Sequence, residues 1–194
     1  MDKKQLRKQM IKTRNTLDDH ARRLHSSNIL QHLSKLDFFQ SARAVAGFVD
    51  FRNEVQMRPI LQHLLAMNIP LMLPRISDDG TQMVFYHVDS LEHLVISRLG
   101  IMEPDPACCV PGDLNQLSLV LTPGVAFTRN GFRLGYGGGY YDRFFESISN
   151  DFLRIGLAFD LQIVADIPCE SHDIRLHGYV TENGFFNTTT ASLL

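Results

Sequence analysis

The sequence lacks a strong excess of charge of either sign. Its 194 residues include 19 Lys and Arg against 21 Asp and Glu, which gives a formal net charge of −2. General nucleic-acid binding needs a marked basic excess, so this balance argues against a nucleic-acid partner. No apolar run reaches membrane-spanning length and no signal-peptide core lies near the start. We therefore expect a soluble, cytoplasmic protein without a membrane partner.

Cysteine is also scarce. The chain has three cysteines, of which Cys108 and Cys109 are adjacent. Such a set is a poor disulfide framework and lacks the spacing of zinc-ligand motifs, which favours a reducing compartment. No residue near them in the sequence would activate a thiol, so we interpret them as small apolar residues. His87 and His93 likewise lack a suitable sequence neighbour and are expected to be surface or hydrogen-bonded histidines.

The remaining composition is that of one globular domain. Hydrophobic residues make up 44% of the chain, and apolar runs alternate with helical patterns. We predict a single α/β domain over residues 1–194, with an open, mixed or mostly parallel sheet flanked by helices in three Rossmann-like layers. Strands are expected at 43–49, 70–74, 83–88, 117–121, 153–159 and 180–181. Helices are expected from Asp2 onward and at 19–36, 55–67 and 140–148, the second with Leu24, Ile29, Leu30 and Leu33 facing inward. The proline-rich residues 103–112 are expected to form a long surface loop.

The stretch from Arg133 to Arg143 organises the functional interpretation. It holds four glycines within five positions, directly ahead of the helix expected from Tyr140. Glycine costs backbone entropy inside a helix or strand, so these residues must be present for the backbone conformation that they allow. Glycine N–H groups ahead of a helix start make a seat for an anion, most often phosphate.

Two well-known phosphate loops do not fit this stretch. The GxGxxG pattern needs a glycine where Tyr140 stands, and the P-loop needs Lys and then Ser or Thr where Tyr140 and Tyr141 stand. A flexible turn is the alternative. Phosphate binding is favoured because Arg133 can fork onto phosphate oxygens and Asp142 can hold a bridging Mg²⁺.

The N-terminal helix has two stripes. Leu6, Met10 and Leu17 fall on one face, and a basic stripe lies roughly 60° to one side at about 100° per residue. The basic stripe consists of Lys3, Arg7 and Arg14. Docking of the apolar face would present these cations at the edge of the contact, although a solvated basic face is the alternative.

Two acids outside the glycine stretch are candidates for ligand binding. Glu54 follows the strand expected at 43–49, and ligands bind at the carboxyl ends of strands in open α/β sheets. It could instead be a helix-start acid. Asp173 follows His172 in a C-terminal loop and could merely turn the chain.

Three segments carry a resemblance to a known family. They are TPGVAF at 122–127, NGFRLG at 130–135 and GYYDR at 139–143. Together they resemble the signature of the 5-formyltetrahydrofolate cyclo-ligases, and the likeness extends weakly over the whole chain. It implies ATP-dependent closure of 5-formyltetrahydrofolate to 5,10-methenyltetrahydrofolate, with reduced folate and ATP as small-molecule partners, Mg²⁺ as cofactor and a monomeric protein.

The resemblance also implies roles for residues of this chain. The residues that it assigns to ATP binding are Lys3, Lys4, Arg7, Arg133, Leu134, Gly135, Tyr136, Gly137, Gly138, Gly139, Tyr140 and Tyr141. Folate binding falls on Arg7, Val49, Glu54, Tyr136 and Tyr140. Catalysis is assigned to Arg133 and Tyr140, the metal to Asp142 and Asp173, and a supporting position to His172.

One departure from the family pattern lies between the glycines. Some members carry basic residues where this chain has Tyr136 and Gly138. Tyr136 could instead stack on or hydrogen-bond the substrate. Two other functions remain open at this point: a non-catalytic nucleotide-binding or regulatory protein, and a sugar-phosphate or coenzyme A enzyme on a related fold.

Overall fold

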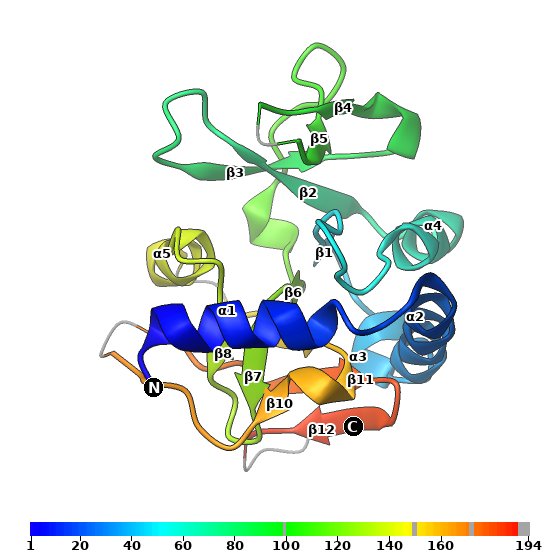
Figure 1. Cartoon of the computed structure of the whole chain (residues 1–194). Coiled ribbons are helices and arrows are strands. Elements are labelled where there is room, and N and C mark those ends of the chain that lie inside the picture. Colours follow the sequence, from blue (N-terminus) through cyan, green and yellow to red (C-terminus); the bar gives the residue numbers. More distant parts are fainter. Residues whose placement is uncertain (99, 149–150, 171–172, 190–194) are drawn as a thin grey trace.

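The centre of the protein is a seven-stranded sheet. In the computed structural model, which describes residues 1–98, 100–148, 151–170 and 173–189, the strand order is β12-β11-β9-β6-β1-β2-β3 (Figure 1). The strands from β11 to β2 run parallel, and β12 and β3 pair antiparallel at the two edges. The strands are β1 Val45–Ala46, β2 Leu71–Ile76, β3 Met83–His87, β6 Leu119–Thr122, β9 Leu153–Leu157, β11 Gly178–Thr181 and β12 Gly184–Asn187. The predicted mostly parallel α/β sheet is confirmed.

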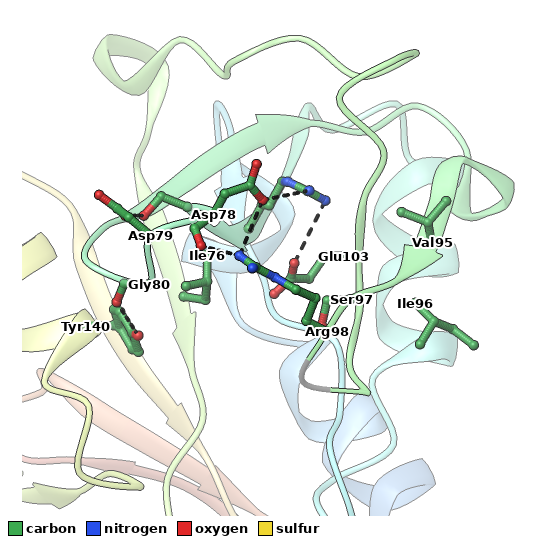
Figure 2. A pocket seen from close by; sticks show the side chains of 12 residues that line it. Ile76, Asp78, Asp79, Gly80, Val95, Ile96, Ser97, Arg98, Glu103 and Tyr140 are labelled. Carbon is green, nitrogen blue, oxygen red and sulfur yellow. Dashed lines mark hydrogen bonds and ion pairs between the residues drawn. The ribbon is translucent and has the colours of Figure 1, made fainter.

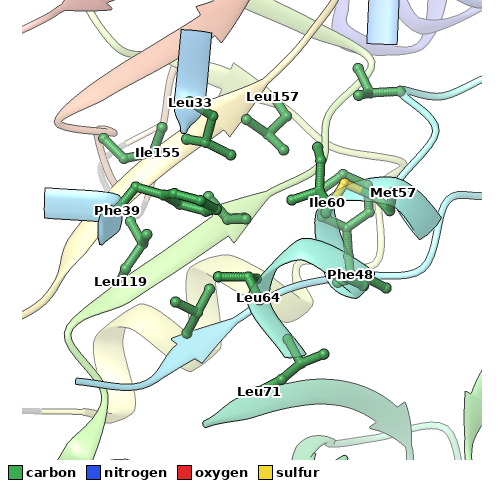
Figure 3. Close-up of a cluster of buried hydrophobic side chains, with 14 of the residues drawn as sticks. Leu33, Phe39, Phe48, Met57, Ile60, Leu64, Leu71, Leu119, Ile155 and Leu157 are labelled. Atoms are coloured by element: carbon green, nitrogen blue, oxygen red, sulfur yellow. The ribbon is translucent and has the colours of Figure 1, made fainter. Parts of the chain in front are cut away.

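Helices cover both faces of this sheet. Alternate strand residues point to opposite faces, so Leu119 and Leu121 join one apolar core and Val120 joins another. The first core packs against α2, α3 and α4, and Figure 3 shows its side chains meeting between sheet and helices. The second packs against α5. The helices are α2 Asp19–Leu33, α3 Asp37–Gln40, α4 Arg58–Ala66 and α5 Tyr140–Ser147. The result is the predicted three-layer arrangement.

The helix α1 (Lys3–Arg14) packs on a separate small sheet. Asp2 caps it as predicted, accepting a hydrogen bond from the Gln5 amide at 2.7 Å. Leu6 and Met10 then meet a third core. The small sheet has the order β10-β7-β8, with β7 Ala126–Thr128, β8 Arg133–Leu134 and β10 Ile163–Val164. The predicted turn at 128–131 joins β7 to β8, so α1 lies over the strands that lead into the glycine stretch (Figure 1).

Part of the predicted surface loop at 103–112 is a strand. β5 (Met102–Pro104) pairs antiparallel with β4 (Leu94–Ile96), which follows the short 3-10 helix η1 (Leu91–His93). Pro104 ends the strand, where its missing N–H costs little. In Figure 1 this two-stranded sheet stands at the top, beside β2 and β3.

The predicted inner face of the second helix is wrong at one position. Leu24 is 52% exposed, whereas Ile29 and Leu33 are fully buried. At about 100° per residue Leu24 lies roughly 140° from Ile29 around the helix, so the two cannot share a face. The helix predicted at 55–67 is α4, which starts later than predicted, at Arg58, with Pro59 in its first turn. None of the helices in the described part of the chain is both long and apolar enough to cross a membrane.

Candidate active site

The glycine stretch forms the link between β8 and α5. Gly137 has φ of 109° and Gly139, the N-cap of α5, has φ of 65°. These are left-handed conformations that favour glycine, and both residues are exposed. A Cβ added at Gly138 would lie 2.6 Å from the ring of Tyr140. The backbone of this segment is therefore bare and open to solvent at a helix start, as an anion seat requires.

Arg133 and Asp142 face each other beneath this segment. Nη2 of Arg133 donates to both carboxylate oxygens of Asp142, at 3.1 and 3.0 Å. The arginine side chain is 4% exposed and the aspartate 20%. The guanidinium also lies 5.4 Å from the ring of Tyr141, whose buried hydroxyl has no hydrogen-bond partner among the described residues. The sequence assigned the arginine to phosphate and the aspartate to metal, and the structure pairs them with each other.

Of the N-terminal cations, Arg7 reaches the glycine segment and Lys3 pairs with the C-terminal loop. Arg7 Nε donates to the carbonyl of Gly135 at 2.7 Å, and its guanidinium lies beside Gly137. Lys3 Nζ is 2.9 Å from Asp173 and 3.0 Å from Glu170. Burial alone would lower the pKa of Lys3, but the two carboxylates outweigh it and raise that pKa. The other residue assigned to ATP at this end, Lys4, is exposed.

Glu54 is buried in a chain of hydrogen bonds that starts on α1. Arg14 Nη2 donates to the Tyr136 hydroxyl at 2.7 Å, and that hydroxyl donates to Glu54 Oε1 at 2.7 Å. Glu54 Oε2 accepts from the Phe51 amide at 2.8 Å, and Arg14 Nη1 lies 3.7 Å from Oε1. Tyr136 thus connects the glycine segment to the acid assigned to folate. Burial, together with the nearby Glu54 charge, raises the pKa of the Tyr136 hydroxyl.

The predicted edge position of Arg14 is wrong. Its side chain is 1% exposed, because Glu54, Tyr136 and the carbonyl of Gly124 surround it. Gln162 is a further residue that sequence reasoning did not single out, and its amide donates to the carbonyls of Gly124 and Val125. The spacing of the basic stripe could have indicated Arg14, whereas no local signal marks Gln162.

Tyr140 lies apart from this network. Its hydroxyl donates to the carbonyl of Gly80 at 2.8 Å, and it borders a cavity of about 360 Å³ (Figure 2). The β2–β3 turn and the β4–β5 sheet form the other walls. In Figure 2 Tyr140 lies at the left, and Val95 and Ile96 lie at the right. Val49 is half-buried against the first core, and His172 lies outside the described residues.

The two acids assigned to Mg²⁺ are each paired with a cation. Asp142 holds Arg133 and Asp173 holds Lys3. Mg²⁺ usually takes one or two carboxylates together with phosphate oxygens and water. Asp142 and Asp173 could supply such carboxylates, and the cation beside each could bind the phosphate. The structure does not show the two acids sharing one site.

The buried position of Glu54 predicts a pH dependence of stability. Burial, the main cause, raises its pKa above the ordinary 4.5 despite the hydrogen bonds and the nearby Arg14. As pH rises, the Glu54 carboxyl loses its proton in the unfolded chain before it does so in the folded protein. The residue therefore favours folding most below its ordinary pKa and progressively less above it. We expect the free energy of unfolding of the natural chain, relative to Glu54→Gln, to fall as pH rises through and above the ordinary pKa of 4.5. Urea unfolding at several pH values measures it, and an increase would show that Arg14 outweighs burial.

A parallel sheet covered on both faces, with an open glycine turn at a helix start and cations around it, is typical of enzymes that handle phosphate-bearing substrates. The family model described as the 5-formyltetrahydrofolate cyclo-ligase family matches residues 1–182. The chain belongs to this family of ligases.

Individual relatives agree with this assignment. The 5-formyltetrahydrofolate cyclo-ligase of Escherichia coli is 34% identical over 144 residues, covering 72% of this chain and 78% of the relative. The mitochondrial enzyme of Arabidopsis thaliana is 27% identical, covering 94% and 74%. The NMR structure of Aquifex aeolicus 5,10-methenyltetrahydrofolate synthetase superimposes with a TM-score of 0.86 at 30% identity, covering 100% and 96%. Since relatives include a mitochondrial protein, the cytoplasmic location of this chain stays a prediction.

Proposed function

We propose that the chain uses ATP to close 5-formyltetrahydrofolate to 5,10-methenyltetrahydrofolate, releasing ADP and phosphate. The family match over residues 1–182 carries this proposal. The glycine segment, with Arg7 beside it and the Arg133–Asp142 pair beneath it, supports the ATP half of the reaction.

The chemistry begins with a poor leaving group. The formyl oxygen of the folate cannot depart unaided, so the γ-phosphoryl group of ATP is transferred to it and ADP forms. The neighbouring amine nitrogen then attacks the formyl carbon, closes the ring and gives up its proton to solvent or to the departing phosphate. The oxygen leaves as part of phosphate, which completes the reaction without a side-chain nucleophile.

Phosphoryl transfer asks the protein for positioning and charge stabilisation. The amides of Gly137 to Gly139 would hold phosphate oxygens, and Arg7 and Lys3 would add charge from α1. Arg133 would turn from Asp142 to the transferring group, since a forked guanidinium can follow developing phosphoryl charge. Mg²⁺ held at Asp142 and Asp173 would neutralise phosphate oxygens when bound.

The folate half of the site centres on Glu54. Its carboxylate would accept hydrogen bonds from the pterin, while the Phe51 amide and Tyr136 keep it oriented. Tyr136 belongs to the glycine segment, so the same side chain would touch the environments of both substrates. We propose that Val49 and Tyr140 contact folate as well, and that the protein works as a monomer in the cytoplasm.

Absorbance measures the proposed reaction directly. The methenyl product is a conjugated amidinium, so the absorbance should move to longer wavelength only when protein, ATP, Mg²⁺ and 5-formyltetrahydrofolate are all present. ATP binding without product would favour a non-catalytic nucleotide-binding protein. Failure to bind reduced folate would favour a sugar-phosphate or coenzyme A enzyme.

Glu54→Gln is expected to weaken folate binding by about ten- to a hundredfold. The change removes a charge-assisted contact of roughly 1.5–3 kcal/mol but keeps an oxygen that can accept from Tyr136. Calorimetric titration should show an unchanged ATP affinity. Glu182→Gln is the matched control, because Glu182 is also largely buried and pairs with His25 instead. Equal folate losses in both variants would remove Glu54 from the folate site.

A further inference from the structure

A second group of reactive side chains lies next to the β4–β5 sheet. One ring nitrogen of His93 and the sulfur atoms of Cys108 and Cys109 all lie within 4.8 Å of one another. The sequence neighbours of these residues gave no sign of this proximity, which arises only in the folded chain. The β4–β5 hairpin folds His93 back onto a turn 15 residues later, a contact that local spacing does not show.

The backbone holds these residues in place. The Asp105 amide donates to the His93 carbonyl at 2.9 Å, which ties the cysteine turn to η1. The amides of Cys108 and Cys109 both donate to the Asp105 carbonyl, at 3.1 and 2.8 Å. The Asp105 side chain accepts from the Ala107 amide at 2.9 Å. The two thiols are thus presented by a closed turn fixed to the histidine's own backbone.

A carboxylate also contacts this histidine. Asp89 Oδ1 lies 2.9 Å from His93 Nδ1. Histidines that bind metals commonly have such a carboxylate, which fixes the ring and raises its basicity. Cys109 is buried at the floor of the group and Cys108 is exposed, so the group is open to solvent on one side.

We propose that His93, Cys108 and Cys109 bind a single Zn²⁺ ion, with Asp89 orienting the histidine and water completing the coordination. Two thiolates and an imidazole are donors that zinc, cadmium and copper(I) accept and that magnesium does not favour. Thiol–thiol and thiol–imidazole separations below 4.8 Å allow one ion to contact all three atoms.

The location of the site gives the ion a structural effect. It would join η1 to the turn after β5, which are the two ends of the β4–β5 unit. The same unit supplies Val95, Ile96 and Glu103 to the cavity that Tyr140 borders. A bound ion would therefore stiffen one wall of that cavity. The site does not depend on the ligase reaction.

Cadmium titration of the reduced, metal-free full chain tests the proposal. Thiolate-to-cadmium charge transfer should give an ultraviolet band that saturates at one ion per chain, and added Zn²⁺ should remove it. Cys108→Ser, Cys109→Ser and His93→Gln should each weaken binding by more than about a hundredfold, and Asp89→Asn by about tenfold. Cys169→Ser is the matched control and should keep the full one-site curve, because Cys169 lies outside the group.

Folding must be separated from metal binding. Cys108 is exposed, so Cys108→Ser should melt at the same temperature as the natural chain without metal. The natural chain should gain thermal stability with Zn²⁺, and this variant should not. Absence of a saturable band would overturn the proposal, as would a band weakened equally by Cys169→Ser or left intact by both Cys108→Ser and His93→Gln.

Discussion

Gly137→Val is expected to weaken ATP binding by about a hundredfold while the chain still folds. Gly137 has φ of 109°, which a branched residue cannot adopt without strain of roughly 1–3 kcal/mol. The segment would relax into another conformation, and its N–H groups would no longer converge on a phosphate. An added Cβ meets nothing closer than Arg7 at 3.6 Å, so the loss should come from the backbone.

The matched control carries the same kind of strain elsewhere. Gly184, the first residue of β12, has φ of 139°, with no atom within 4 Å of an added Cβ. Gly184→Val should reduce the melting temperature about as much as Gly137→Val and leave ATP affinity unchanged. Calorimetric titration with Mg²⁺ and ATP gives the affinities. Normal ATP binding by the Gly137 variant would rule out the backbone phosphate seat.

Arg133→Ala is expected to reduce turnover by about 10²–10³-fold, more than Lys3→Ala. Removing one preorganised donor from a developing charge typically costs that much. Arg133 is held in a nearly buried position by Asp142 and Tyr141, whereas Lys3, on the first turn of α1, offers a single ammonium group without the guanidinium fork. Initial rates of methenyl formation at saturating substrates measure the difference.

Two further variants distinguish catalysis from folding. Arg133→Lys keeps the positive charge beside Asp142 but loses the fork, so it should fold normally and recover only part of the rate. Asp142→Asn should raise the Mg²⁺ concentration needed for turnover, with folate affinity unchanged. Equal rate losses for the Arg133 and Lys3 variants would show that neither cation follows the transferred group preferentially.

The main layers of the fold could be predicted because their signals are local. The buried runs around Val45 and Leu119 are nearly continuous in apolar residues, and the cap at Asp2 and the glycines before Tyr140 mark helix starts. β4, β5, β10 and β12 have two to four residues each and become strands only through partners distant in sequence. No periodicity develops over such lengths.

The candidate site also has a part that the sequence could predict and a part that it could not. The glycine segment is contiguous, so residue types alone could predict a glycine-rich turn ahead of the helix that starts at Tyr140. Arg14, Tyr136 and Glu54 come from three separate segments, and only the packing of α1 over β7 and β8 brings them together. The same packing explains why Arg14 is a buried partner of Glu54 and not the surface cation that helical spacing indicated.

Each cation that we propose to bind phosphate is paired with an acid that we propose to bind Mg²⁺, and this pairing affects which form of the nucleotide the site accepts. In the free protein Lys3 pairs with Asp173, and Arg133 pairs with Asp142. Each of these four charges therefore has an opposite charge beside it. A magnesium–nucleotide complex carries both signs, so each pair can separate and every member regains an opposite charge. Free ATP satisfies the cations but leaves the carboxylates facing phosphate oxygens. The resting ion pairs should therefore select the metal complex over the bare nucleotide before any chemistry begins.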